Sequence, residues 1–291
     1  MQVALIGLSY NKNISNMKII TNTMLVFTIC LAFTGKAQLQ FDYPITEIEP
    51  AEYIVTYSHT YQRDSLSDFT NQSDMFLFLG KNTSYFISNK FYSQDTIVRN
   101  IRNMEGLQSF LMDKNRPFPK IGYRIWKNYP PGKITYVDGV PSNVYRYKET
   151  LNLFDWDISG STDSIQGYFA QKATCNFGGR KWIAWFTTEI PYSDGPYKFN
   201  GLPGLIIKVY DTRHHYEFKI VKIEKPDYKL MIDIKEKNYV ETTKQNFFKA
   251  KDAFYGNIRN RAKEAGLDKK AQQHAAKAVS RRNNPIELKR E

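Results

Sequence analysis

The segment from Trp182 to Asp211 constrains the fold of this 291-residue chain more than any other part. Pro203 and Gly204 are adjacent within it. Proline presets φ for the second position of a turn, and glycine supplies the positive φ that a type II turn needs at the third. The next residues form a short apolar run interrupted only by one lysine, which is typical of a buried strand. The segment therefore predicts a type II turn over residues 202–205 that leads directly into a strand over residues 205–210.

A second strand is predicted upstream of this turn. Residues 182–186 are apolar at both odd and even positions, which point to opposite faces of a strand. We therefore expect both faces of that strand to be covered. Backbone geometry alone explains glycines and prolines in turns. We therefore interpret the whole segment as a folding motif in preference to a ligand-binding loop.

This segment resembles the signature of the GLPGLI family, a group of exported bacterial proteins without an assigned activity. The closing residues Asn283 to Leu288 also match the pattern of that family. The resemblance implies an exported protein and a structural role for the matching residues, and it implies no reaction. These residues are Gly179, Arg180, Trp182, Trp185, Glu189, Pro191, Gly195, Pro196, Gly201, Leu202, Pro203, Gly204, Leu205 and Ile206.

The N-terminus has the pattern of a secretory signal peptide. An apolar stretch over residues 19–33 is too short for a retained membrane helix and is followed by small residues around Ala37. We predict that residues 1–37 are an upstream extension plus a signal peptide, and that the mature chain starts at Gln38. A bulky Ile29 precedes Cys30, which makes a poor lipidation site. The predicted location is the periplasm, the outer membrane or the medium.

Composition and charge predict one β-rich domain with a basic end. Only Cys175 remains after the leader, so the fold has no internal disulfide, and 20 Tyr, 19 Phe and 4 Trp supply its core. Residues 244–291 hold 13 Lys and Arg against 5 Asp and Glu, out of a net charge of +12 for the whole chain. We expect a β-rich domain over 38–243 and a basic helical segment over 244–291, packed on that domain or extending from it. A solvated helix face or contact with an anionic envelope surface fits this segment better than nucleic acid.

Period-two patterns along the chain indicate the fold class. Residues 75–79 and 83–88 flank Gly-Lys-Asn, and residues 123–129 and 133–137 flank Pro-Pro-Gly, so both pairs are predicted hairpins. Successive strands joined by short turns predict a mainly β (α+β) fold. We expect a curved antiparallel sheet or a partly closed β-barrel with a C-terminal helix packed on it.

Further elements follow from the same patterns. Strands are predicted over 53–58, 151–156, 167–177 with Phe169 and Cys175 inward, 216–223, and 228–235 with Tyr228 inward. Residues 63–74 are predicted to be a polar connection, and residues 101–112 a short helix. A later helix is predicted to begin with Thr242 as its cap and Gln245 three residues on, and an exposed helix to follow over 269–281.

No motif for a cofactor or a hydrolase nucleophile occurs in the sequence, so no cofactor and no metal are expected. The adjacent His214 and His215 are the best metal candidate, but a polar hairpin tip explains them more simply. Glu189, Asp194 and Asp211 could form a carboxylate pair for glycoside cleavage. Alternatively, one of these acids pairs with Arg180 as a structural clamp.

Three Asp-Ser/Thr-aliphatic triplets resemble acceptor sites for O-glycosylation of exported proteins. Their candidate acceptors are Ser65, Thr96 and Ser164. Because Asp-Ser is also ordinary turn chemistry, chance matches remain an alternative.

The sequence favours a non-catalytic envelope protein that binds an apolar small molecule, a lipid or an envelope protein on the aromatic-rich side of its sheet. The first alternative is a carboxylate-dependent hydrolase that acts on envelope carbohydrate. The second is a purely structural surface component, which would have no concave pocket.

Overall fold

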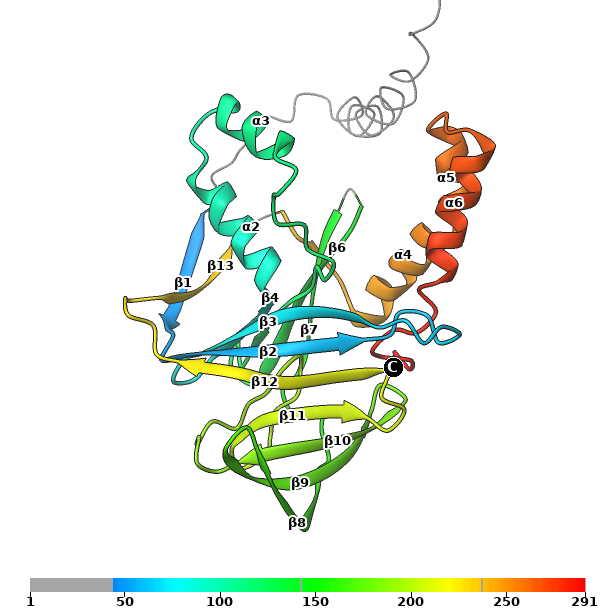
Figure 1. The fold of residues 1–291 in the computed structure, drawn as a ribbon. Helices are drawn as coiled ribbons and strands as arrows, with labels where there is room; N and C mark the ends of the chain where they lie inside the picture. Colours follow the sequence, from blue (N-terminus) through cyan, green and yellow to red (C-terminus); the bar gives the residue numbers. More distant parts are fainter. Residues whose placement is uncertain (1–43, 142, 237, 291) are drawn as a thin grey trace, which may run out of the picture.

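The computed structural model describes residues 44–141, 143–236 and 238–290. Within these residues one long sheet of twelve strands dominates the fold (Figure 1). Its strands, in spatial order, are β14 (Val240–Glu241), β7 (Asn143–Thr150), β6 (Lys133–Val140), β5 (Arg124–Lys127), β4 (Ser84–Ser88), β3 (Asn71–Leu79), β2 (Tyr53–Tyr61), β12 (Tyr216–Glu224), β11 (Leu205–Asp211), β10 (Arg180–Thr187), β9 (Tyr168–Phe177) and β8 (Asp157–Ile165).

The mainly β prediction is confirmed, and the sheet is curved but open. Neighbouring strands are antiparallel except β14 and β7, which are parallel, so the sheet is mixed. The strand order ends at β14 on one side and at β8 on the other, so the sheet does not close into the predicted partial barrel. β8 to β11 curve beneath the molecule, whereas β6 and β7 run upright (Figure 1).

Apolar side chains cover both faces of the middle of the sheet. On β3, β5 and β6, consecutive residues such as Leu77 and Phe78, or Ile125 and Trp126, belong to two different buried clusters. The smaller cluster lies under a second, two-stranded sheet of β1 (Ile45–Pro50) and β13 (Met231–Lys235). This burial on both faces explains why the strands read as nearly continuous apolar runs.

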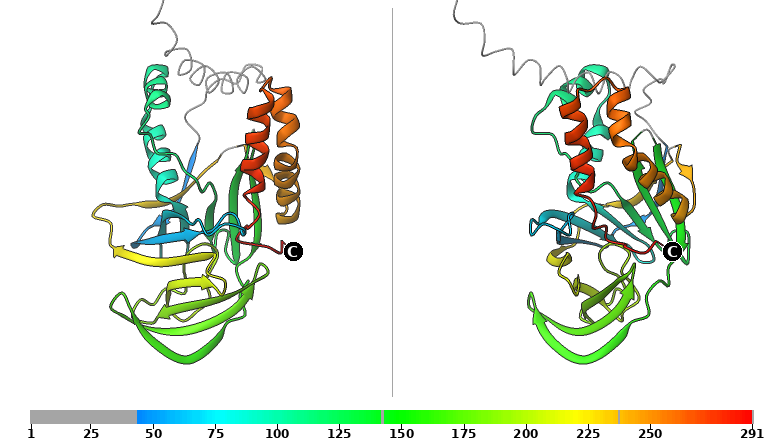
Figure 2. Two further views of the ribbon diagram at one scale, coloured as in Figure 1. Left: turned by 45° about the vertical axis from the view of Figure 1, so that its right-hand side comes forward. Right: turned by 90° about the vertical axis from the view of Figure 1, so that its right-hand side faces the viewer.

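Two groups of helices stand on the same side of the long sheet. α2 (Asn89–Asn100) and α3 (Met104–Met112) form one group, and α4 (Lys244–Gly256), α5 (Ile258–Glu264) and α6 (Lys269–Ser280) form the other (Figure 2). α4 is anchored by Phe247, which is fully buried against the sheet, whereas α6 has no buried residue. The prediction of a docked helix followed by an exposed one is therefore confirmed.

Several predicted elements are confirmed, including both hairpins. β3 pairs with β4 and β5 pairs with β6, each antiparallel around its predicted turn. The strands predicted over 53–58 and 216–223 correspond to β2 and β12, and the helix predicted over 101–112 corresponds to α3. Cys175 is buried on β9 as expected.

Other predictions are wrong, each for a local reason. Residues 151–156 are not a strand, because the chain crosses there between β7 and β8, and Trp156 donates to the carbonyl of Asn200 at 2.8 Å. Phe169 is exposed although Ala173 is buried, because β8 has an irregular register opposite this part of β9. Tyr228 is exposed because β13 begins only at residue 231.

Two boundaries and one whole helix also differ from the predictions. Residues 63–74 are not all a connection, because β3 already begins at Asn71 and extends the pairing with β2. α2 was not predicted at all, since it has no buried residue and no clear apolar stripe. Thr243, not Thr242, caps α4 by accepting from the backbone N–H of Asn246 at 3.2 Å.

The predicted signal peptide, including Cys30, lies outside the described residues. Across the part of the chain that the structure describes, no helix combines the length and the apolar character needed to cross a membrane.

Candidate functional site

The turn at the centre of the signature is tighter than the predicted type II turn. Gly204 has φ +153° and donates its N–H to the carbonyl of Leu202 at 2.8 Å, so only Pro203 lies between donor and acceptor. The N–H of Leu205 bonds instead to the carbonyl of Ile190 at 3.0 Å. A Cβ on Gly204 would lie 2.1 Å from the carbonyl oxygen of Thr187. Glycine is thus required because the ends of β10 and β11 approach each other here.

The other signature residues lie on the turn before β10, on β10, on the loop over 188–204, and on β11. Buried members are Arg180, Trp182, Gly195, Pro196, Leu202, Gly204, Leu205 and Ile206; Trp185 is half-buried; Gly179, Glu189, Pro191, Gly201 and Pro203 are exposed. A Cβ on Gly195 would lie 2.8 Å from that of Ile206, so the loop packs tightly against β11. The hydroxyl of Tyr57 on β2 donates to the carbonyl of Ile206 at 2.7 Å.

Arg180 ties the signature to the C-terminal end of the chain. Its guanidinium pairs with Asp211 at 3.0 Å, and both side chains are only 2% exposed. The same group donates to the side chain of Asn284 at 2.6 Å and to the carbonyls of Pro285 and Ile286 at 2.6 and 3.0 Å. The predicted clamp between Arg180 and one of the three acids is therefore confirmed, with Asp211 as the partner.

Glu287, within the closing residues, makes a second set of buried polar contacts. Its carboxylate accepts from Tyr197 at 2.6 Å and pairs with Lys198 and Lys244 at 2.7 Å each. Lys198 has no exposed area and also contacts Glu149 on β7. This network joins the signature loop, the start of α4 and the chain end around one buried carboxylate.

Burial by itself would raise the pKa of Glu287, but the ammonium groups of Lys198 and Lys244 outweigh burial and hold the pKa at about 2, against an ordinary value of 4.5. Because the folded-state pKa lies below the unfolded-state pKa, this carboxylate stabilises the fold above pH 4.5, and its contribution decreases as the pH falls toward 2.

We predict that the difference in free energy of unfolding between the wild type and Glu287→Gln will shrink by about 2 kcal/mol between pH 6 and pH 3. Urea unfolding at both pH values measures this difference. Glu105→Gln, at an exposed position on α3, serves as the control and should show no comparable change. An E287Q difference that stays constant with pH would contradict the assigned role of the carboxylate.

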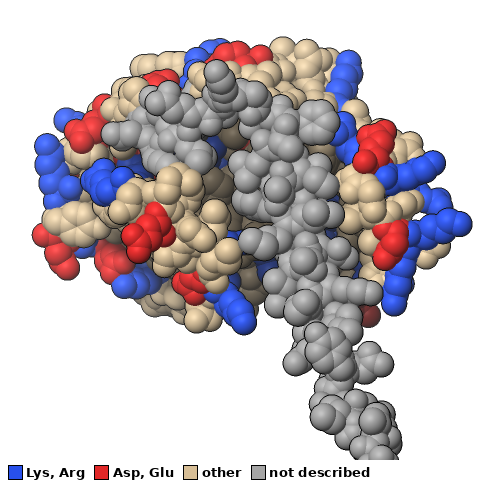
Figure 3. Space-filling model, turned by 90° about the horizontal axis from the view of Figure 1, so that it is seen from above, with Lys and Arg blue, Asp and Glu red and all other residues tan. Residues whose placement is uncertain are grey.

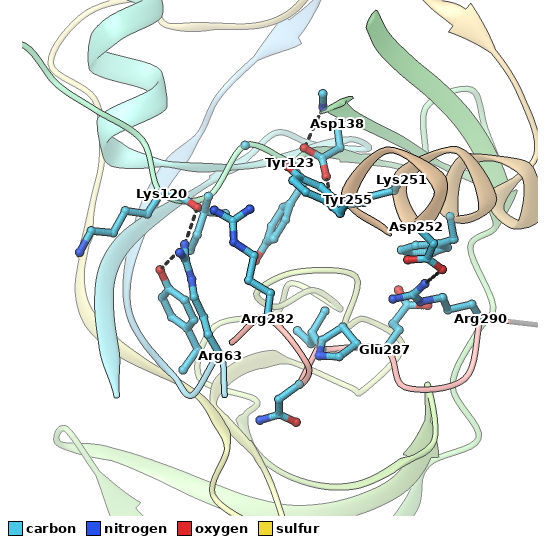
Figure 4. Close-up of a pocket in the computed structure, with 18 of the residues that line it drawn as sticks. Arg63, Lys120, Tyr123, Asp138, Lys251, Asp252, Tyr255, Arg282, Glu287 and Arg290 are labelled. Carbon is cyan, nitrogen blue, oxygen red and sulfur yellow. Dashed lines mark hydrogen bonds and ion pairs between the residues drawn. The ribbon is translucent and has the colours of Figure 1, made fainter. Parts of the chain in front are cut away.

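A cavity of about 590 Å³ lies beside this network (Figure 4). Strands of the long sheet form one side of the cavity. α4 and the end of α6 form a second side, and the residues after α6 complete the lining. This volume is within the range of small-molecule sites in proteins, which span roughly 300–1,000 Å³. The signature and the closing residues contribute Tyr197 and residues 284–287 to the lining, so the clamp positions part of the wall.

Seven phenylalanine and tyrosine rings belong to the lining. Tyr123 contacts both Tyr136 and Tyr197, with ring centroids 6.0 and 5.3 Å apart. On the sheet, Tyr61 and Tyr216 add two more rings, and α4 adds Phe248 and Tyr255; these four also line the cavity. Such rings offer broad apolar surface with polar edges, which suits a ligand that is apolar along much of its length.

Two buried polar groups of the lining have no hydrogen-bond partner among the described residues. Both ring nitrogens of His59 are unpaired, although its side chain is 98% buried and stacks on Phe218 at 3.9 Å. Burial lowers the pKa of His59 to about 3, so the ring is neutral at pH 7. The hydroxyl of Tyr123 is the second unpaired group. Buried polar groups are normally hydrogen-bonded, so these atoms are exceptions in the cavity wall.

The three candidate catalytic carboxylates do not face one another. Asp211 is held by Arg180, Asp194 pairs with the buried Lys127, and the exposed Glu189 accepts from the backbone of Phe169 at 2.8 Å. Each acid thus has a separate structural partner. None of the three lines the cavity, so this arrangement gives no support to the hydrolase alternative.

The histidine pair and the cysteine have structural environments. His214, with φ +55°, lies at the turn between β11 and β12 and stacks on Tyr210, while His215 approaches Arg180 at 3.5 Å. No cluster of three metal-binding side chains occurs among the described residues. Burial raises the pKa of the Cys175 thiol to about 12, so the thiol is not activated as a nucleophile.

The three candidate glycosylation acceptors lie in different structures. Ser65 is exposed in a loop and donates to Asn283 at 2.8 Å, whereas Ser164 is exposed on the edge strand β8. Thr96 lies on α2 and donates to the carbonyl of Tyr92 at 2.9 Å.

Basic side chains of the C-terminal segment gather on α5 and α6. On the right of Figure 3, where these helices lie, lysine and arginine side chains project outward with a few carboxylates between them. This part of the surface is therefore cationic but mixed.

Sequence reasoning missed Lys198, Glu287 and the cavity lining on α4. A signal for the first two was present, because each is a charged residue between apolar neighbours inside a segment that matched the family pattern. Such a position predicts a buried, paired charge. No comparable signal marks the residues on α4, since only the tertiary arrangement brings them to the cavity.

Together these features define a mainly β protein in which the signature and the closing residues form part of the wall of a ligand-sized cavity. The family described as "Protein of unknown function (Porph_ging)" has a sequence model that matches residues 178–208. This match confirms the resemblance to the GLPGLI family over the segment that carries the signature. A search of curated proteins found no match.

Two solved proteins resemble the fold at low similarity. PNGF-II, in two crystal forms, shares 12% and 14% identity with TM-scores of 0.49, over 70% of this chain and 33% and 34% of PNGF-II. The LolA superfamily protein NE2245 from Nitrosomonas europaea shares 7% identity with a TM-score of 0.27, over 62% of this chain and 89% of that protein. The chain thus spans about a third of PNGF-II, and neither likeness is close enough to indicate a function.

Proposed function

We propose that this protein is a non-catalytic binding protein whose cavity holds an amphipathic small molecule with an apolar or aromatic body. The observation that carries the proposal is the cavity of about 590 Å³ with seven aromatic residues in its lining. The rings provide apolar contact, and the charged side chains of the lining can fix the orientation of the ligand.

We also propose that the protein works outside the cytoplasm, in the periplasm or at the outer membrane, and that residues 44–290 fold as one unit. The apolar stretch near the N-terminus and the family match support export. The clamp between Arg180 and the closing residues supports a single unit, because it joins β10, in the middle of the proposed domain, to the C-terminal end. N-terminal sequencing of protein from fractionated cells tests export, and a retained leader would contradict it.

N-phenyl-1-naphthylamine, an uncharged aromatic probe whose fluorescence increases in apolar surroundings, tests the binding proposal directly. We expect saturable binding to one site of the wild-type protein. Val279→Trp adds a large ring to a residue that lines the cavity, and should weaken probe binding at least about tenfold by occupying that space.

Ala278→Trp provides a matched control, because it adds the same ring one position earlier on α6, at an exposed residue outside the lining. This variant should bind the probe like the wild type. Equal binding by both tryptophan variants, or no saturable binding by the wild type, would overturn the proposal.

A further inference from the structure

The cavity wall holds more basic than acidic side chains. The basic residues of the lining are Arg63, Lys120, Lys251, Arg282 and Arg290, and the acidic residues are Asp138, Asp252 and Glu287. Each of the three acids is already neutralised. Lys251 pairs with Asp138 at 2.8 Å, Arg290 pairs with Asp252 at 2.6 Å, and Glu287 has its own two lysines.

Two arginines remain without a carboxylate partner among the described residues. Arg63 donates to the carbonyl of Lys120 at 2.9 Å and approaches the hydroxyl of Tyr61 at 3.4 Å. Arg282, just beyond α6, lies over the ring of Tyr255 with 5.3 Å to its centroid. Both arginines therefore keep free N–H donors.

The two guanidinium groups lie on the same side of the cavity. In the view of Figure 4 the guanidinium groups of Arg63 and Arg282 lie near each other, although these residues follow the end of β2 and the end of α6. A guanidinium presents a planar fork of donors that matches a carboxylate, sulfonate or phosphate oxygen pair. On the other side of the cavity the charged residues pair with one another, so these two forks form the part of the lining where a cation has no acid beside it.

Resting on the proposed function, we propose that the cavity selects anionic amphiphiles, whose acidic group binds between Arg63 and Arg282 while the apolar body lies along the tyrosine wall. An uncharged molecule of the same shape would use the wall but leave the arginines unpaired.

A matched pair of competitors separates the charge from the shape. 2-Naphthoate and 2-naphthalenemethanol carry the same ring, and only the former is anionic at pH 7. We expect 2-naphthoate to displace N-phenyl-1-naphthylamine from the wild type at concentrations about tenfold lower than the alcohol. The preference should decrease as salt is raised from 20 mM to 500 mM, because salt screens the arginines.

The double variant Arg63→Gln/Arg282→Gln should still bind the uncharged probe but lose the preference, so that both competitors act within about twofold of each other. The control Arg259→Gln/Arg281→Gln removes the same charge from exposed residues outside the lining and should keep the preference. If the double variant fails to fold, the exposed Arg282→Gln alone takes its place, with a smaller expected loss.

Equal displacement by both competitors in the wild type, or an undiminished preference in the arginine variant, would overturn this inference and leave the proposed function intact. Absence of saturable probe binding would instead remove the proposed function, and the inference with it. Circular dichroism of each variant verifies that its fold is retained.

Discussion

Replacing Arg180 with methionine is expected to lower the free energy of unfolding by about 4 kcal/mol. The substitution would leave Asp211 charged and buried with no cation beside it, since both side chains are 2% exposed. It would also remove the donors that reach Asn284 and the two carbonyls after it. Urea unfolding followed by tryptophan fluorescence measures the loss.

Two further variants separate the effect of the unpaired Asp211 carboxylate from the other effects of this substitution. Arg180→Met/Asp211→Asn removes the unpaired carboxylate and should recover part of the lost stability, while the amide oxygen can still accept from Tyr216. Arg213→Met, an exposed arginine at the neighbouring turn, should change stability by less than about 0.5 kcal/mol. A loss below about 1 kcal/mol for R180M would show that the clamp contributes little.

Gly204→Ala is expected to cost about 3 kcal/mol or more, for two reasons that act together. A Cβ at this position would lie 2.1 Å from the carbonyl oxygen of Thr187, which belongs to the backbone of β10. In addition, φ of +153° is strained for any residue with a side chain. Thermal and urea unfolding of the variant measure the effect.

Gly160→Ala on the edge strand β8 is the matched control, because a Cβ there would meet nothing within 4 Å. This variant should be neutral or slightly more stable, since alanine restricts the unfolded chain more than glycine does. Similar stabilities for the two alanine variants would mean that the β10 and β11 ends can separate without cost.

Local patterns predicted those parts of the fold whose stabilising contacts are close in the sequence. Both hairpins were predicted because alternating apolar residues flank a turn of glycine or proline, and the strands pair with their neighbours along the chain. The strand over 151–156 was predicted wrongly because its apolar residues pack against the distant signature loop and do not join the sheet. For example, Phe154 contacts Phe199 at 5.1 Å between ring centroids.

The candidate site was predicted less completely than the fold. The pairing of Arg180 with an acid followed from its position beside a strand expected to be buried, since a buried cation needs a partner. Its contacts to Asn284 and beyond lie more than a hundred residues away in the sequence, and no periodicity reports such a distance. The sequence also did not predict that the ring nitrogens of His59 lack hydrogen-bond partners, because this depends on which groups surround the ring in the folded protein.

The sequence by itself determined the mainly β class, the signature as a folding motif, and the division between a docked and an exposed C-terminal helix. These follow from local backbone preferences and from which faces carry apolar side chains. Only the tertiary structure decided that the sheet stays open, that glycine is required at position 204 because two strands approach each other there, and that a cavity forms beside α4. Those features depend on how distant segments meet, and a pattern within one segment carries no information about its partner.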